Sequence, residues 1–129
     1  MKIQHIKVSH EDDRGSISDI LQHINVDSVT LITIKEGAIR GNHFHKKSVQ
    51  YSYVLSGQVI AFIQINNQRV EKAVLNKGDM LESPVMEKHA LHGVEANSTL
   101  LILTLGPRGG NQYEDDTFRT PPLHESYSK

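Results

Sequence analysis

The stretch GAIRGNHFHKKSVQYSYVLSG, from Gly37 to Gly57, decides the fold, and it holds two closely spaced histidines. His43 and His45 are two positions apart, and side chains two positions apart on a β-strand point to the same face. Gln50 follows on the next segment and adds an amide that can donate or accept hydrogen bonds. Two imidazoles on one face of a strand suit either metal binding or proton transfer.

Short runs of alternating or β-branched residues recur along the chain, with turn residues between them. No segment keeps a helical period over several turns, and short strands at this spacing are typical of a sandwich or barrel. The sequence therefore predicts an all-β fold, a single antiparallel β-barrel or jelly roll. Residues 16–22 suit either a short strand or a helical turn. We expect strands at residues 2–8, 28–34, 40–46, 50–55, 58–65, 69–75, 80–83, 89–94 and 99–105.

The C-terminal part of the chain differs in composition from the rest. Residues 106–129 read GPRGGNQYEDDTFRTPPLHESYSK and are rich in glycine, proline and charge, so we expect a mostly irregular tail. Within it, residues 113–119 either fold back over the barrel, cross to a dimer partner or form a solvated loop. The length of 129 residues favours one domain over residues 1–129.

Composition excludes several classes of function. The net charge is −1 and there is no basic patch with aromatic residues, so a nucleic-acid partner is not expected. No run approaches the roughly 20 apolar residues that a membrane-spanning helix needs, and the N-terminus has no apolar signal core. We therefore expect no membrane partner. The chain has no cysteine, which excludes disulfides and thiolate chemistry and fits a cytoplasmic protein.

The two histidine-bearing segments resemble the paired motifs of the cupin superfamily. This resemblance implies a small antiparallel barrel in which the three motif histidines point inward and meet. Gln50 stands where the usual cupin motif has glutamate. The first motif is matched by Gly37, His43, His45, Gln50 and Gly57, and the second by Gly78, Pro84 and His89.

Three shorter segments resemble the cupins of nucleotide-sugar metabolism. They are DDRGSI at residues 12–17, RGNHFHKKSVQ at 40–50 and YEDDTFR at 113–119. The resemblance is closest to the dTDP-sugar 3,4-ketoisomerases and more distant to the dTDP-4-dehydrorhamnose 3,5-epimerases. It implies an isomerase or epimerase that acts on a nucleotide-linked keto-sugar without a cofactor, with His43 and His45 as acid and base. Arg14 then lies in the nucleotide-sugar pocket, although a plain turn is the alternative.

Such a reaction needs a cation or hydrogen-bond donor near the enediolate oxygen. Arg40 is the nearest candidate by sequence, but it lies three residues before His43, and a regular strand would point it to the opposite face. A bulge or turn at Gly41 would re-aim it, and a surface arginine paired with an acid is the alternative. Gln50 and Tyr53 are the further residues that we assign to substrate binding, although sheet packing is the more common role of such a tyrosine.

The same side chains also suit a metal site. His43, His45, His89 and the Gln50 carbonyl could hold a divalent ion such as Zn, Fe, Ni or Mn, with positions left open for water or ligand. This alternative predicts a metal-dependent cupin of the sugar-phosphate isomerase or oxygenase type. A non-catalytic sugar-binding module is the third possibility. We also expect a homodimer, because such barrels commonly pair edge strands and the first strand is a natural donor.

Overall fold

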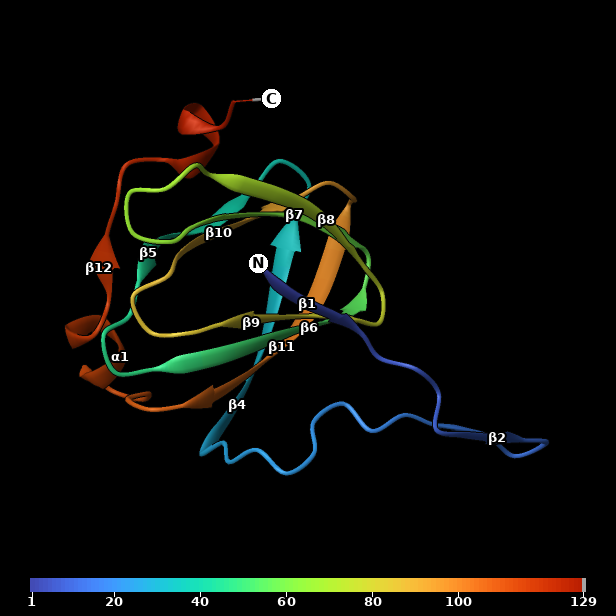
Figure 1. Ribbon diagram of the computed structural model, residues 1–129. Coiled ribbons are helices and arrows are strands. Elements are labelled where there is room, and N and C mark those ends of the chain that lie inside the picture. The colour runs from blue at the N-terminus through green and yellow to red at the C-terminus, as the bar shows by residue number, and fades with distance from the viewer. Residues whose placement is uncertain (129) are drawn as a thin grey trace.

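Two five-stranded sheets face each other in the computed structural model, which describes residues 1–128 (Figure 1). Lys129, the last residue of the predicted tail, lies outside the described residues. The first sheet contains, in order, β1 (Lys2–His5), β9 (Asp79–Ser83), β6 (Val49–Ser56), β11 (Asn97–Leu105) and β4 (Ser28–Lys35). The second contains β12 (Phe118–Arg119), β5 (Ile39–Phe44), β10 (Lys88–Gly93), β7 (Gln58–Gln64) and β8 (Glu71–Asn76).

All strand pairs within these sheets are antiparallel, and the sheets close around one apolar core. The prediction of an all-β antiparallel jelly roll is thus confirmed. Burial alternates along β6 and β11, which is the pattern of strands with one face on a core and one face toward solvent. The largest core cluster consists of Ile34, Val54, Val59, Ala61, Leu75, Leu81, Leu91, Leu100 and Ile102.

Most strands lie where the sequence predicts them, with ends that agree within two residues. The exception is the first strand, which ends at His5 because the chain leaves the sheet after the Ile6 amide bonds to the Gly78 carbonyl at 2.8 Å. Of the two possibilities for residues 16–22, the short strand is present, but only as part of β3 (Gly15–Ile17). This strand pairs with β2 (His10–Asp12) in a hairpin that projects away from the barrel (Figure 1).

The C-terminal segment folds back over the second sheet. It contains the short helix α1 (Gln112–Asp115), strand β12 and the 3₁₀-helix η1 (Leu123–Ser126), joined by irregular chain. Strand β12 pairs with β5, and Leu123 of η1 is 2% exposed in a cluster with Phe62, Val70 and Ala90. In the part of the chain that the structure describes, no helix is long and apolar enough to span a membrane.

Candidate active site

A cavity of about 390 Å³ lies between the two sheets, and both sheets and the C-terminal segment line it. Its polar lining includes His43 on β5, His89 on β10 and Gln50 on β6, and its apolar lining includes Leu91 and Ile102. A concave site in which polar groups converge beside apolar residues suits a small molecule, and this cavity is richer in polar and charged lining than most such sites.

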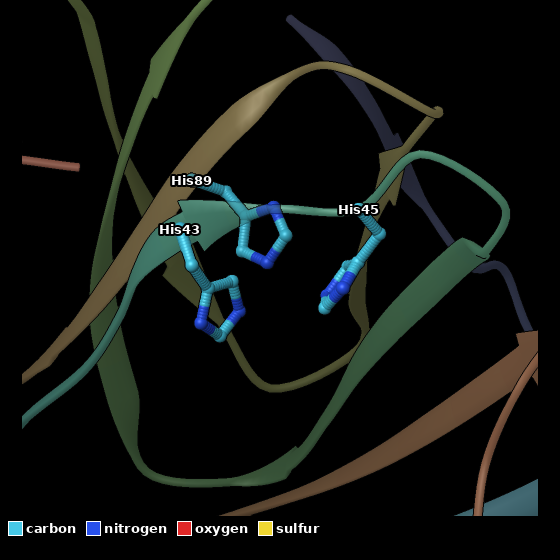
Figure 2. A group of neighbouring side chains, drawn as sticks. All are labelled: His43, His45 and His89. Atoms are coloured by element: carbon cyan, nitrogen blue, oxygen red, sulfur yellow. The ribbon is translucent and has the colours of Figure 1, made fainter. Parts of the chain in front are cut away.

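Three histidines meet at this cavity, as the cupin resemblance implies. His43 and His89 lie directly opposite each other on β5 and β10, and their ring centroids are 4.7 Å apart. His45 follows the end of β5 and turns its ring toward the other two (Figure 2), with its centroid 4.8 Å from that of His43. One nitrogen from each ring lies within 4.8 Å of the others. His45 is deeper than its neighbours, since it is 2% exposed and does not belong to the cavity lining.

Backbone carbonyls set the tautomers of two of these rings. Nδ1 of His45 lies 2.9 Å from the Asp116 carbonyl oxygen, and Nδ1 of His89 lies 3.3 Å from that of Glu87. A carbonyl oxygen only accepts hydrogen bonds, so Nδ1 must carry the proton in both rings. Nε2 of the neutral His89 ring therefore keeps its lone pair, and Nε2 of His45 has no partner among the described residues.

Burial keeps two of the imidazoles neutral. It lowers the pKa of His43 to about 3, assisted by the nearby His89, His45 and Arg119, and it lowers the pKa of His89 to about 4, assisted by His45. Both rings are therefore uncharged at neutral pH. An uncharged imidazole can accept a proton from a substrate or donate its lone pair to a metal.

These pKa values predict that acid destabilises the fold. The pKa of an unfolded histidine is about 6.5, so from there down to about pH 4 the unfolded state binds protons that folded His43 and His89 exclude. The free energy of unfolding should fall by about 1.4 kcal/mol per pH unit for each histidine over this interval, and neither should contribute above it. Urea unfolding from pH 7 to pH 4, with a chelator present, measures the slope. The double variant His43→Asn, His89→Asn should show a smaller slope, and an unchanged slope would contradict the assignment.

Arg40 reaches the cavity because β5 is bulged. The register between β5 and β10 shifts between His89 and Ala90, opposite Gly41, whose φ is +106°, and Asn42, whose φ is +56°. The irregularity re-aims Arg40 into the cavity lining, where its Nε donates to the Thr33 carbonyl at 3.1 Å. Arg40 thus bonds to backbone and not to an acid, which favours the bulge over the surface ion pair.

Two further arginines and a tyrosine enter the lining from the C-terminal segment, and sequence reasoning did not single them out. Arg119 lies beside the cavity and pairs with Glu114 at 2.9 Å. The Arg108 guanidinium stacks 4.1 Å from the ring centroid of Tyr113, and that ring is 5.2 Å from the ring of His45. Tyr113 and Arg119 belong to the segment YEDDTFR, whose resemblance to nucleotide-sugar cupins could have pointed to them. Arg108 lies in the glycine-rich run GPRGG, which gives no comparable indication.

Of the three residues assigned to substrate binding, one lines the cavity and two lie outside it. Gln50 lines the cavity, and its side chain is 5% exposed. Tyr53 does not line the cavity, contrary to our expectation, because it lies three residues from Gln50 and so on the opposite face of β6. Arg14 lies at the turn of the projecting hairpin, where it pairs with Asp12 at 2.6 Å, outside the cavity of its own chain.

The donor set at the cavity fits a divalent ion. Nε2 of His45 and Nδ1 of His43 are buried and have no hydrogen-bond partner within residues 1–128, and imidazole nitrogens suit Zn, Fe or Ni. Nε2 of the Gln50 amide also lacks a partner, and turning this amide would present its oxygen to the same space. The site could thus hold a metal as well as transfer protons.

A jelly roll that encloses three histidines from two separate segments is a cupin-type barrel. The narrower grouping follows from the sequence itself, because the family model described as the polysaccharide biosynthesis C-terminal domain matches residues 10–118. The chain belongs to this family. No curated protein matches its sequence.

Solved structures share the fold at low sequence identity. QdtA, a sugar 3,4-ketoisomerase from Thermoanaerobacterium thermosaccharolyticum in complex with TDP, is 22% identical, with a TM-score of 0.76 over 97% of this chain and 93% of that one. The dTDP-6-deoxy-D-glucose-3,5-epimerase RmlC from Legionella pneumophila is 14% identical, with a TM-score of 0.78 over 96% and 74%. CapF, a capsular polysaccharide assembling protein from Staphylococcus aureus, is 18% identical, with a TM-score of 0.66 over 91% and 34%.

Proposed function

We propose that the protein is an isomerase or epimerase that acts on a nucleotide-linked keto-sugar, such as a 3,4-ketoisomerase, by proton transfer through its histidines. The observation that carries this proposal is the uncharged His43 ring in a cavity that arginines also line. The fold shared with QdtA, which is a sugar 3,4-ketoisomerase, supports the choice of substrate class.

The proposed reaction begins at the carbon next to the sugar ketone. Neutral His43 takes the proton from this carbon, the electron pair of the C–H bond forms a C=C bond to the carbonyl carbon, and the π pair of the carbonyl moves to its oxygen to give an enediolate. A guanidinium of Arg40 or Arg119, which both line the cavity, stabilises the oxygen that becomes negative. A protonated imidazole then returns a proton to the former carbonyl carbon. The hydroxyl on the carbon that was first deprotonated gives its proton to the former carbonyl oxygen, and its own oxygen becomes the new ketone. His45, adjacent to His43, is the second imidazole of this acid–base pair.

Substrate binding would also make His43 a stronger base. The positive charge of Arg119 is one of the causes that lower the pKa of His43, after burial and the other two histidines. An anionic diphosphate group paired with Arg119 would cancel that charge and favour the imidazolium form. The same change would not occur with an uncharged sugar, so a nucleotide-linked substrate suits this cavity better than a free one.

Deuterium wash-in tests the proposal directly. The protein is incubated in D₂O with dTDP-4-keto-6-deoxyglucose, and the sugar is analysed by NMR and mass spectrometry. We expect deuterium at the carbon next to the ketone at a rate above that without protein. Measurable binding with no wash-in would overturn the catalytic proposal and leave the non-catalytic sugar-binding module as the function.

A metal-dependent activity is the second candidate, and the convergence of three imidazole nitrogens favours it. In that case His43, His45 and His89 would hold the ion, which would polarise a substrate oxygen as a Lewis acid. Metal analysis of protein purified without added ions, followed by wash-in with and without a chelator, separates the two candidates. Stoichiometric metal together with activity lost on chelation would replace the metal-free mechanism.

We also propose that the chain forms a homodimer. Val29 and Leu31 on the outer face of β4 are 61% and 62% exposed, and Val8 just before the projecting hairpin and Ile17 within it are also exposed. Apolar surface of this kind commonly marks an interface. In a dimer, Arg14 of one chain could reach the cavity of the other, whereas it lies outside the cavity of its own chain.

Light scattering tests the dimer. The wild-type protein should have twice the mass of one chain, and Leu31→Lys should shift the mass toward that of the monomer. A monomeric wild-type protein would contradict the proposal.

A further inference from the structure

Asp116 is a buried acid whose carboxylate is held by backbone amides. It is 4% exposed, and its two oxygens accept hydrogen bonds from the N–H groups of Lys46, Lys47 and Ser48 at 3.0–3.2 Å. The Ser48 hydroxyl adds a further bond at 3.1 Å. Burial alone would raise the pKa of Asp116, but these hydrogen bonds lower it below its ordinary value. The carboxylate therefore stays charged at neutral pH and fixes the chain at residues 46–48.

The backbone of the same residue contacts the catalytic histidine that precedes this turn. The Asp116 carbonyl accepts the Nδ1 proton of His45 at 2.9 Å, so one residue binds both the His45 ring and the chain directly after it. In addition, the Asp116 amide bonds to the Tyr113 carbonyl at 3.2 Å, which ties this contact to the helix that carries Tyr113 into the cavity.

These contacts determine which nitrogen of the His45 ring carries a proton. The Asp116 carbonyl favours a proton on Nδ1 of His45, and in the uncharged form of this ring Nε2 is then the nitrogen that carries the lone pair. If the carboxylate is lost, three neighbouring N–H groups lose their acceptor, and that of buried Ser48 alone would cost about 1–3 kcal/mol if it stayed without a partner. The turn at residues 46–48 would then rearrange, and the His45 ring would leave the Asp116 carbonyl.

We infer that Asp116 is a positioning residue that sets the tautomer of His45, by holding the turn after this histidine with its side chain and the ring with its carbonyl. The inference rests on the proposed function only for its effect on rate, because the tautomer can be observed without substrate. Sequence reasoning missed this role, since nothing in the run YEDDTFR distinguishes Asp116 from its acidic neighbours.

The test is the ¹⁵N NMR signature of the His45 ring in metal-free protein at neutral pH, assigned by its loss in His45→Asn. The wild-type ring should be the Nδ1–H tautomer, and Asp116→Asn should convert it to a mixture while wash-in of deuterium falls by about 10- to 100-fold. Asp115→Asn is the matched control, because this neighbouring acid of α1 is exposed, and it should leave both readouts unchanged.

The outcomes separate the inference from the proposed function. An Nε2–H tautomer in the wild-type protein, or an unchanged Nδ1–H tautomer in Asp116→Asn, would overturn the inference. If Asp116→Asn does not fold, Ser48→Ala removes only the hydroxyl bond and should still produce a measurable fraction of the second tautomer; none would likewise overturn it. Absence of wash-in with the wild-type protein, together with the expected tautomers, would contradict the proposed function alone.

Discussion

Replacement of His43 by asparagine is expected to abolish deuterium wash-in, with a loss of about 10²- to 10⁴-fold. In the proposed mechanism His43 is the member of the acid–base pair that lines the cavity, whereas His45 is more buried and does not belong to the lining. Asparagine is polar and similar in size, but it cannot take up a proton near neutral pH. His45→Asn should give a loss of the same order, because the proposed acid–base pair then lacks its second member. Wash-in rates at saturating keto-sugar measure both effects.

His92→Asn is the matched control for these variants. His92 lies on the same strand as His89, but its ring contacts Phe62 and His124 under the C-terminal segment and not the cavity. This variant should retain wild-type wash-in, and circular dichroism and thermal unfolding should show that all variants fold. Full activity in the His43→Asn, His45→Asn double variant would end the acid–base hypothesis.

The histidine cluster could be predicted from sequence because two separate patterns converged on it. The alternation of side chains placed His43 and His45 on one face, and the second motif supplied His89 at the spacing of a cupin barrel. The register of β5 against β10, which the sequence does not state, then puts His43 opposite His89. Fold and cluster followed from periodicity and motif together.

The surroundings of the cluster could not be predicted in the same way. The direction of Arg40 depends on a bulge whose presence is decided by the pairing of two strands. Arg108 and Asp116 come from a segment without strand or helix periodicity, and its path over the second sheet depends on distant partners for Leu123 and strand β12. Tyr53 is different, since the alternation that places Gln50 inside already places Tyr53 outside, and the rule should have excluded it.

Gly41→Ala is expected to destabilise the fold by about 2–5 kcal/mol, since backbone strain and overpacking act together. Gly41 has a φ of +106°, a conformation that residues with a side chain rarely adopt. A Cβ at this position would lie 2.7 Å from the His89 carbonyl oxygen and 2.9 Å from the Ala90 Cα. Both atoms belong to the backbone of β10, so only a separation of β5 from β10 would relieve the contact. Urea unfolding at neutral pH measures the loss.

Gly109→Ala isolates the effect of the close approach. Gly109 also has a positive φ, +77°, but a Cβ there would meet nothing within 4 Å, so this variant bears the backbone strain alone. The amount by which Gly41→Ala lowers the free energy of unfolding more than Gly109→Ala therefore measures the cost of the close contact between β5 and β10. Because His43 and His89 face each other across the same strand pair, the displacement should also reduce wash-in in the fraction of protein that remains folded. Equal stability losses in the two alanine variants would show that the bulge at Gly41 does not set the spacing of these histidines.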